Sequence, residues 1–66
     1  MSVLKVLEIL SNSDKSWEDA TQKAVTKASE TVKSIRSVNI SNMSAIVENG
    51  KISEYRVNVK IAFEVK

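Results

Sequence analysis

The stretch YRVNVKIAFEV, residues 55–65, decides the fold of this chain. Its apolar side chains take every second position over eleven residues, at Tyr55, Val57, Val59, Ile61, Phe63 and Val65. Period-2 alternation predicts a half-buried strand with one apolar face. Upstream, Asn49-Gly50 suits a two-residue type I′ turn, whose central residues both need positive φ. We therefore expect a hairpin with strands at residues 37–48 and 51–65.

The first strand of this hairpin has a less regular pattern. Val38, Ile40 and Ile46 fall on one face if the alternation is unbroken, although Asn42 and Ser44 interrupt that face. On the closing strand, Tyr55 and Phe63 are expected inside with the other apolar residues.

The N-terminal half predicts a strand followed by a helix. VLKVLEIL (3–10) is apolar, and the polar run SNSDKS after it favours a strand over residues 2–11. Ser16 can cap a helix N-terminus, with acidic residues in the first turn. Apolar residues then recur at steps of three or four, which predicts a helix over 16–35: Trp17, Ala20, Ala24, Ala28, Val32 and Ile35. Trp17 is expected to be a core or interface anchor.

These elements predict an α+β fold of β-α-β-β type in one domain, residues 1–66. If the last strand lies between the other two, the sheet is antiparallel with strand order first-third-second. The helix then covers one face and leaves Arg56, Asn58 and Lys60 on the bare one. Open edge strands invite pairing with another chain. Since the chain is short and has no Cys or His, we expect association with its own copies to stabilise it.

The composition argues against several classes of protein. Without His or Cys, a Ser-His or Cys-His nucleophile cannot be built, and a single Gly excludes a Gly-rich phosphate loop, so we expect no enzyme. The net charge is +2 with scattered Lys, which disfavours nucleic acid as a partner. No apolar run is long enough to span a membrane, and we expect a cytoplasmic protein.

Three segments together resemble the dodecin family: KVLEILSNSDKSWEDATQKAV (5–25), ASETVKSIR (28–36) and ISEYRVNVKIAFEVK (52–66). The resemblance covers nearly the whole chain. It implies a protomer whose sheet partly wraps around its helix, assembled into a hollow homododecamer that stores or sequesters flavin. Riboflavin or FMN is then held in pairs between subunits, stacked on a Trp and hydrogen-bonded by a Gln.

Residue by residue, the flavin site carries over only in part. The stacking Trp position holds Ser37, the ring-edge Gln position holds Arg56, and the position near the ribityl chain holds Asn42. Arg56 could still stack on a ring and donate hydrogen bonds, bind an anion, or form an ordinary interface salt bridge. The expected cofactor-binding residues are therefore Ser37, Asn42 and Arg56.

Three hypotheses stay open at this point. In the first, a dodecin-like shell binds flavin between subunits. In the second, the shell has lost flavin and holds calcium, magnesium or a small anionic ligand, because repeated carboxylates can meet at its symmetry axes. The third is an interaction module that adds its edge strand to a partner. The sequence points to no particular metal ligands.

Overall fold

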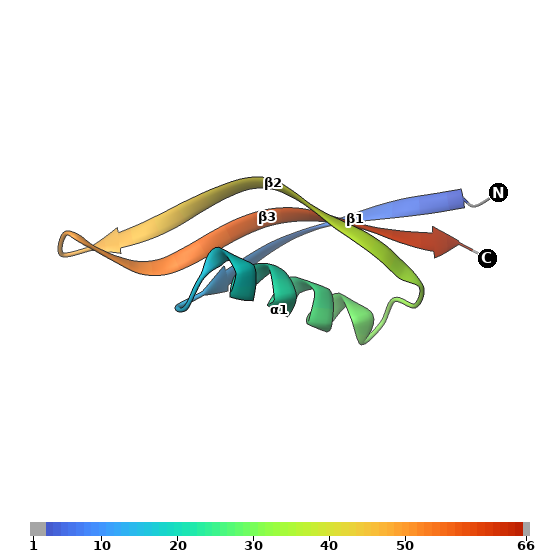
Figure 1. Cartoon of the computed structure of the whole chain (residues 1–66), viewed down its shortest axis with the longest axis horizontal. Helices are drawn as coiled ribbons and strands as arrows, with labels where there is room; N and C mark the ends of the chain where they lie inside the picture. The colour runs from blue at the N-terminus through green and yellow to red at the C-terminus, as the bar shows by residue number, and fades with distance from the viewer. Residues whose placement is uncertain (1–2, 66) are drawn as a thin grey trace.

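The computed structural model describes residues 3–65, which form three strands and one helix (Figure 1). The elements are β1 (Val3–Ser13), α1 (Trp17–Ser29), β2 (Ile35–Glu48) and β3 (Lys51–Val65). The sheet has the order β1-β3-β2, and both strand pairs are antiparallel. The predicted α+β fold with β-α-β-β topology is confirmed.

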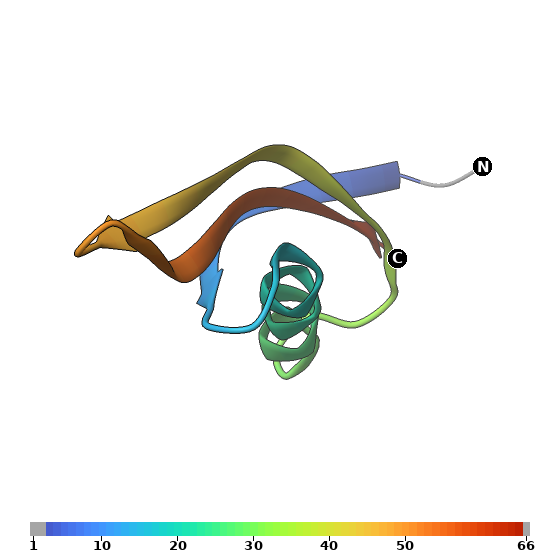
Figure 2. The same ribbon diagram turned by 60° about the vertical axis from the view of Figure 1, so that its left-hand side comes forward.

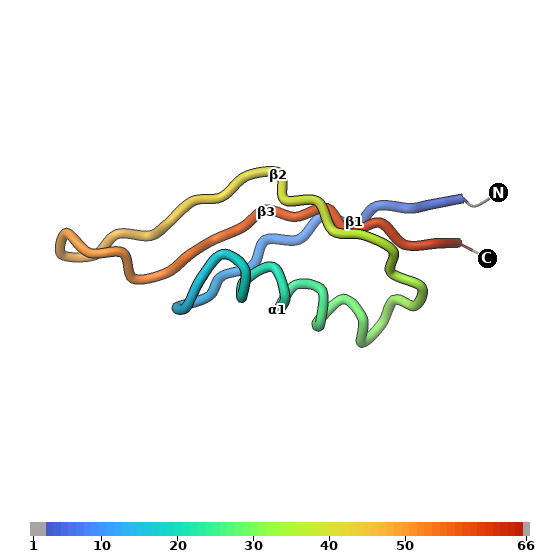
Figure 3. Tube along the Cα trace, viewed as in Figure 1, coloured from blue at the N-terminus to red at the C-terminus, as the bar shows by residue number. Residues whose placement is uncertain are grey.

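The sheet bends over the helix and covers it like an arch (Figure 2). The trace in Figure 3 shows that the hairpin of β2 and β3 continues past the start of the helix, while both ends of the chain lie at the opposite end. Asn49 and Gly50 close the hairpin with φ of 53° and 75°, as a type I′ turn requires. The protomer is therefore elongated, with extents of 50 × 20 × 13 Å.

The core is a stripe of alanines packed on the central strand. Ala20, Ala24 and Ala28 of α1 are buried, and they meet three fully buried residues of β3: Val57, Val59 and Ile61. Small side chains let the helix backbone lie close to the sheet. Tyr55 and Phe63, at the two ends of the same face, lie beyond the three buried alanines and are only half-buried.

The helix is shorter than predicted. It ends at Ser29 and not at residue 35, since the chain turns away after the Val32 N–H donates to the Ala28 carbonyl. Ser34 then takes a left-handed conformation, with φ of 63°, and Ile35 enters β2 opposite Phe63. Val32 and Ile35 fitted a helical stripe by spacing alone, but Ile35 reaches the core from a strand.

The first strand extends further than predicted, to Ser13, while residue 2 of the expected strand lies outside the described residues. Asn12 and Ser13 continue the pairing with β3, opposite Arg56 and Tyr55. The strand can end on polar residues because the buried Ser13 hydroxyl is satisfied: it donates to Asp19 Oδ2 at 2.6 Å.

The predicted helix cap is confirmed. The Asp19 N–H donates to Ser16 Oγ at 2.9 Å, which satisfies one of the free amides at the helix start. Ser13 Oγ also accepts the Lys15 N–H at 2.9 Å, so the connection between β1 and α1 is held at both its ends.

The predicted face of β2 is wrong in its second half. Ile40 pairs with Val59 and Asn42 pairs with Asn58, so Ser41 is an extra residue that bulges out of the ladder. A bulge of one residue sends every later side chain to the other face. Ile46 therefore lies on the side away from the helix, and Asn42 and Ser44 join it there instead of interrupting the face of Val38 and Ile40.

Candidate functional site

The side of the sheet away from α1, called here the open face, is the candidate site. It consists of the residues that alternate with those facing the helix, and the strand pairing arranges them in rows. The rows run from β1 through β3 to β2: Val6–Ala62–Ser37, Glu8–Lys60–Asn39, Leu10–Asn58–Asn42 and Asn12–Arg56–Ser44.

The β1 side of the open face is largely apolar, with Glu8 between Val6 and Leu10. Leu4, Val6 and Leu10 are exposed to 52%, 62% and 68% of their surface. Several large apolar side chains exposed on one face are typical of an interaction site. The β2 side is different in character, since Asn39, Asn42 and Ser44 present amides and a hydroxyl there.

Arg56 lies in the polar part of the open face, and a neutral amide holds its side chain. Its Nε donates to Asn12 Oδ1 at 3.0 Å across the β1–β3 pair. Within residues 3–65, the recorded salt bridges do not involve Arg56. The exposed guanidinium thus keeps its charge and its remaining donors for a ligand or another chain.

The row next to Arg56 contains two amides. Asn42 pairs with Asn58, and Asn58 Oδ1 is enclosed without a hydrogen-bond partner among the described residues. Buried carbonyl oxygens are almost always hydrogen-bonded in folded proteins. The oxygen is covered by atoms of this chain, so a donor from outside can reach it only when the Asn58 amide turns toward the surface, and the Arg56 donors lie one row away.

The structure brings two of the three expected site residues into neighbouring rows and places the third apart. Asn42 lies in the row next to that of Arg56. Ser37 lies opposite Ala62, six residues along β3 from Arg56. At a rise of about 3.3 Å per residue, the separation is roughly 20 Å along the strand. One ring cannot contact Ser37 and Arg56 of the same chain, so a shared site requires a second copy.

Sequence reasoning missed the role of Asn12. The predicted strand stopped at residue 11, and the run Ser11-Asn12-Ser13 has the composition of a loop. The only sequence signal for a longer strand is that polar residues follow Leu10 at alternate positions. Three residues are too few for such an alternation to be recognised. The hydrogen bond to Arg56 spans 44 positions of sequence and becomes visible only with the pairing of β1 and β3.

Trp17 serves as a structural anchor, as predicted. Its indole N–H donates to the Ser44 carbonyl at 2.8 Å, and its ring meets Tyr55 edge-on with centroids 4.9 Å apart. It also packs against the alanine core. The ring therefore joins α1 to the hairpin.

The acidic residues are dispersed. Across residues 3–65, no three or more His, Cys, Asp or Glu side chains gather as metal ligands would. The hydrogen bond from the Ser13 hydroxyl, helped by the Lys23 ammonium, lowers the pKa of Asp19. The described part of the chain also contains no helix that is long and apolar enough to cross a membrane.

Comparison with known proteins gives consistent matches over the whole chain. The family model described as Dodecin matches residues 3–66. The protein named calcium dodecin, from Mycobacterium tuberculosis, is 36% identical over 67 aligned residues, which cover 100% of this chain and 93% of that protein.

Solved structures agree with the fold. Dodecin from Streptomyces coelicolor superposes with a TM-score of 0.93 at 23% identity, over 98% of this chain and 93% of the other. The tt0972 protein from Thermus thermophilus gives 0.93 at 21%, over 100% and 97%. The calcium-chelating calcium dodecin of M. tuberculosis, described as having a novel calcium-binding site, gives 0.84 at 35%, over 98% and 93%.

Proposed function

This chain belongs to the dodecin family, and from that membership we propose that it is a binding and storage protein whose copies form a hollow dodecamer and hold a small ligand between them. The open face carries the proposal. No part of residues 3–65 covers its exposed side chains Leu4, Val6 and Leu10, and a second copy can cover them. Sizing by light scattering tests the assembly, since a particle of one or two chains would contradict it.

For the ligand, we propose first a flavin, riboflavin or FMN, held by Arg56, Asn42 and Asn58. The edge of the flavin ring carries an N–H between two carbonyls, so it needs an acceptor next to donors. Asn58 Oδ1 is an acceptor without a partner among the described residues, and a turn of the amide toward the surface would offer it to the ring N–H; the Arg56 donors lie in the next row. Ser37 offers no ring for stacking, which contributes about 1–3 kcal/mol per base in nucleic-acid sites. We therefore expect weak binding.

We propose calcium as the second candidate, with magnesium as the related alternative. It is favoured by the 36% identity to a protein named calcium dodecin and by Ser37 at the stacking position. Calcium takes six to eight oxygen ligands. Because the acidic residues of one chain are dispersed, several copies would have to contribute ligands. A small anion bound by Arg56 belongs to the same hypothesis of a shell without flavin.

One pair of measurements separates the two candidates. Flavin is titrated into the chelator-treated protein and its fluorescence is followed, and the melting temperature is recorded with EDTA and with added calcium. Quenching that saturates supports flavin, and a melting point that rises with calcium supports the cation. If neither signal appears in the intact assembly, both ligand proposals are wrong although the assembly stands.

A further inference from the structure

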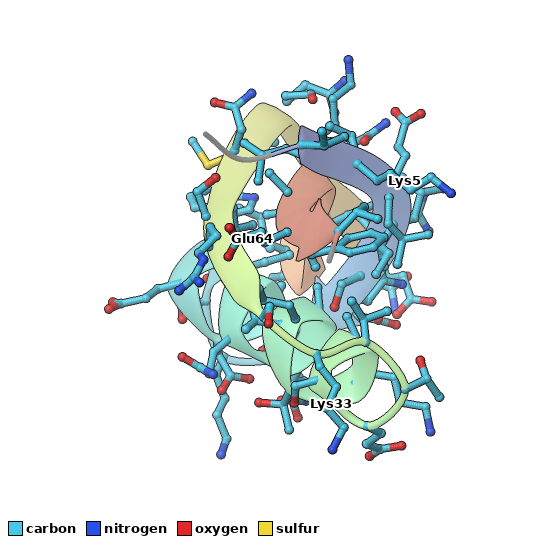
Figure 4. The ribbon with its side chains drawn as sticks, turned by 90° about the vertical axis from the view of Figure 1, so that its right-hand side faces the viewer. Lys5, Lys33 and Glu64 are labelled. Carbon is cyan, nitrogen blue, oxygen red and sulfur yellow. The ribbon has the colours of Figure 1, made fainter. Side chains whose placement is uncertain are left out.

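A cavity separate from the open face lies at the end of the molecule where β1 begins and β3 ends. It has a volume of about 480 Å³ and opens between the connection after α1, the start of β1 and the end of β3; Figure 4 labels Lys5, Lys33 and Glu64 from its lining. Its lining is mainly apolar and includes Val32, Phe63 and Val65. This size falls within the range of about 300–1,000 Å³ that is usual for small-molecule sites.

The cavity exists because the helix stops before the sheet does. The alanine stripe ends at Ala28, whereas β3 continues on the same face to Phe63 and Val65. The connection turns away with the positive φ of Ser34 and spans the gap without filling it. Phe63 is therefore half-buried, with part of its ring available to a ligand.

Two cations border the opening. Lys5 comes from β1 and Lys33 from the connection, and in Figure 4 they lie on different sides of this end of the molecule. Neither forms an ion pair with any residue from 3 to 65. Glu64 also borders the cavity, but its carboxylate pairs with Arg36, which offsets its charge. The local balance is positive beside an apolar lining.

We propose that this cavity binds an amphipathic organic anion, with an alkyl chain or aryl ring on Val32, Phe63 and Val65 and a carboxylate or sulfonate held by Lys5 and Lys33. The lysine stems are apolar and flexible, so their ammonium groups can turn to the anion while the stems extend the apolar wall. This site is independent of the ligand on the open face, and it can be occupied whether or not flavin or calcium binds there.

The test uses decanoate as the probe and decanol as its neutral counterpart, titrated by calorimetry into the assembled protein. Decanoate should bind with one site per chain, and decanol should bind about two- to thirtyfold more weakly, since the two exposed ion pairs contribute roughly 0.2–1 kcal/mol each. Raising the salt from low to physiological concentration should weaken the binding of decanoate and leave the binding of decanol unchanged.

Variants locate the site. Lys33→Gln and Lys5→Gln should each lower the affinity for decanoate by roughly two- to fivefold. Val32→Asn should lower the affinities for decanoate and decanol alike. Lys51→Gln, at the hairpin tip, is the matched control and should have no effect. The proposal is overturned if decanoate does not saturate, if Lys51→Gln weakens it as much as Lys33→Gln, or if a crystal structure of the assembly shows a segment of a second copy filling the cavity.

Discussion

The side chain of Arg56 is held by Asn12, whose Oδ1 lies 3.0 Å from the arginine Nε across two strands. The bond fixes one donor of the guanidinium and orients the plane on the open face. A neutral partner leaves the full positive charge in place, which a carboxylate partner would have offset. This pair lies one row from Asn58, whose Oδ1 has no hydrogen-bond partner among residues 3–65.

The first prediction concerns this pair. Asn12→Ala removes one hydrogen bond to Arg56, so flavin affinity should fall by about fivefold, equivalent to roughly 1 kcal/mol. Fluorescence quenching measures the change. Asn39→Ala, elsewhere on the open face, is the control and should bind as the parent does. Equal affinities for all three proteins would show that Arg56 does not need Asn12 to bind the ligand.

A second prediction tests the stacking position. Ser37→Trp supplies an aromatic ring at the start of β2, and stacking worth about 1–3 kcal/mol should tighten flavin binding by roughly 5- to 150-fold. Ser37→Leu controls for size without an aromatic face. Sizing must first show that both variants still assemble. A Trp variant that assembles and binds no better than the Leu variant would remove flavin from this position.

Assembly through the open face gives the third prediction. Val6 is exposed to 62%, so Val6→Asp should leave the protomer fold intact but place a charge in the contact between copies. We expect the particle mass by light scattering to fall to smaller species. Gln22→Asp, on the exposed side of α1, should keep the parent mass. A full-size particle from Val6→Asp would mean that the copies meet elsewhere.

The fourth prediction concerns the stripe of buried alanines on α1. Ala24 is 2% exposed against β3, so Ala24→Leu forces the helix away from the sheet and should lower the free energy of unfolding by about 1–3 kcal/mol. Gln22→Leu places the same leucine on the exposed side of the helix and should change the free energy of unfolding little. Denaturant unfolding measures both. An unchanged Ala24→Leu midpoint would contradict the close helix–sheet contact.

The fifth prediction is a pH dependence at the helix start. The pKa of Asp19 is lowered in the fold, first by the Ser13 hydroxyl and also by Lys23. A lowered pKa means that the ionised carboxylate stabilises the fold at every pH above 3.8, the ordinary pKa that applies to the unfolded chain. This stabilisation is lost as the pH falls below 3.8 and through the lower pKa of the folded state.

Asp19→Asn should therefore be less stable than the parent at pH 7, and the difference should shrink toward pH 3. Denaturant unfolding at both pH values measures it. Asp14→Asn, in the same connection, serves as the control. A difference that grows on acidification would mean that the carboxylate is not the stabilising form.

Much of the fold could be predicted because its strongest sequence patterns coincide with the core. The alternation from Tyr55 to Val65 became the central strand, and Asn49-Gly50 became its turn. The helix end was missed because Val32 and Ile35 have helical spacing, and only pairing with Phe63 puts Ile35 into a strand. The bulge at Ser41 has no local signal in the sequence, since any small polar residue could occupy it.

The site was less accessible to sequence reasoning. The family resemblance grouped Arg56 with Asn42, but the alternation placed Asn42 on the face of Val38 and Ile40, and only the bulge at Ser41 puts it beside Asn58 on the open face. The distance of Ser37 from Arg56 follows from the pairing register, which the two-residue turn at Asn49-Gly50 sets by pairing Glu48 with Lys51. The hydrogen bond of Asn12 depends on the last two residues of β1, which resemble a loop in composition.

The pairing of Val3 with Val65 has a practical consequence. Because these two residues are neighbours on adjacent strands, reporter proteins or peptide tags fused at either end of the chain would leave the protomer from the same place. Fused at both ends, they would be held side by side, which makes this pole of the molecule suitable for bringing two different enzymes or dyes together on one particle.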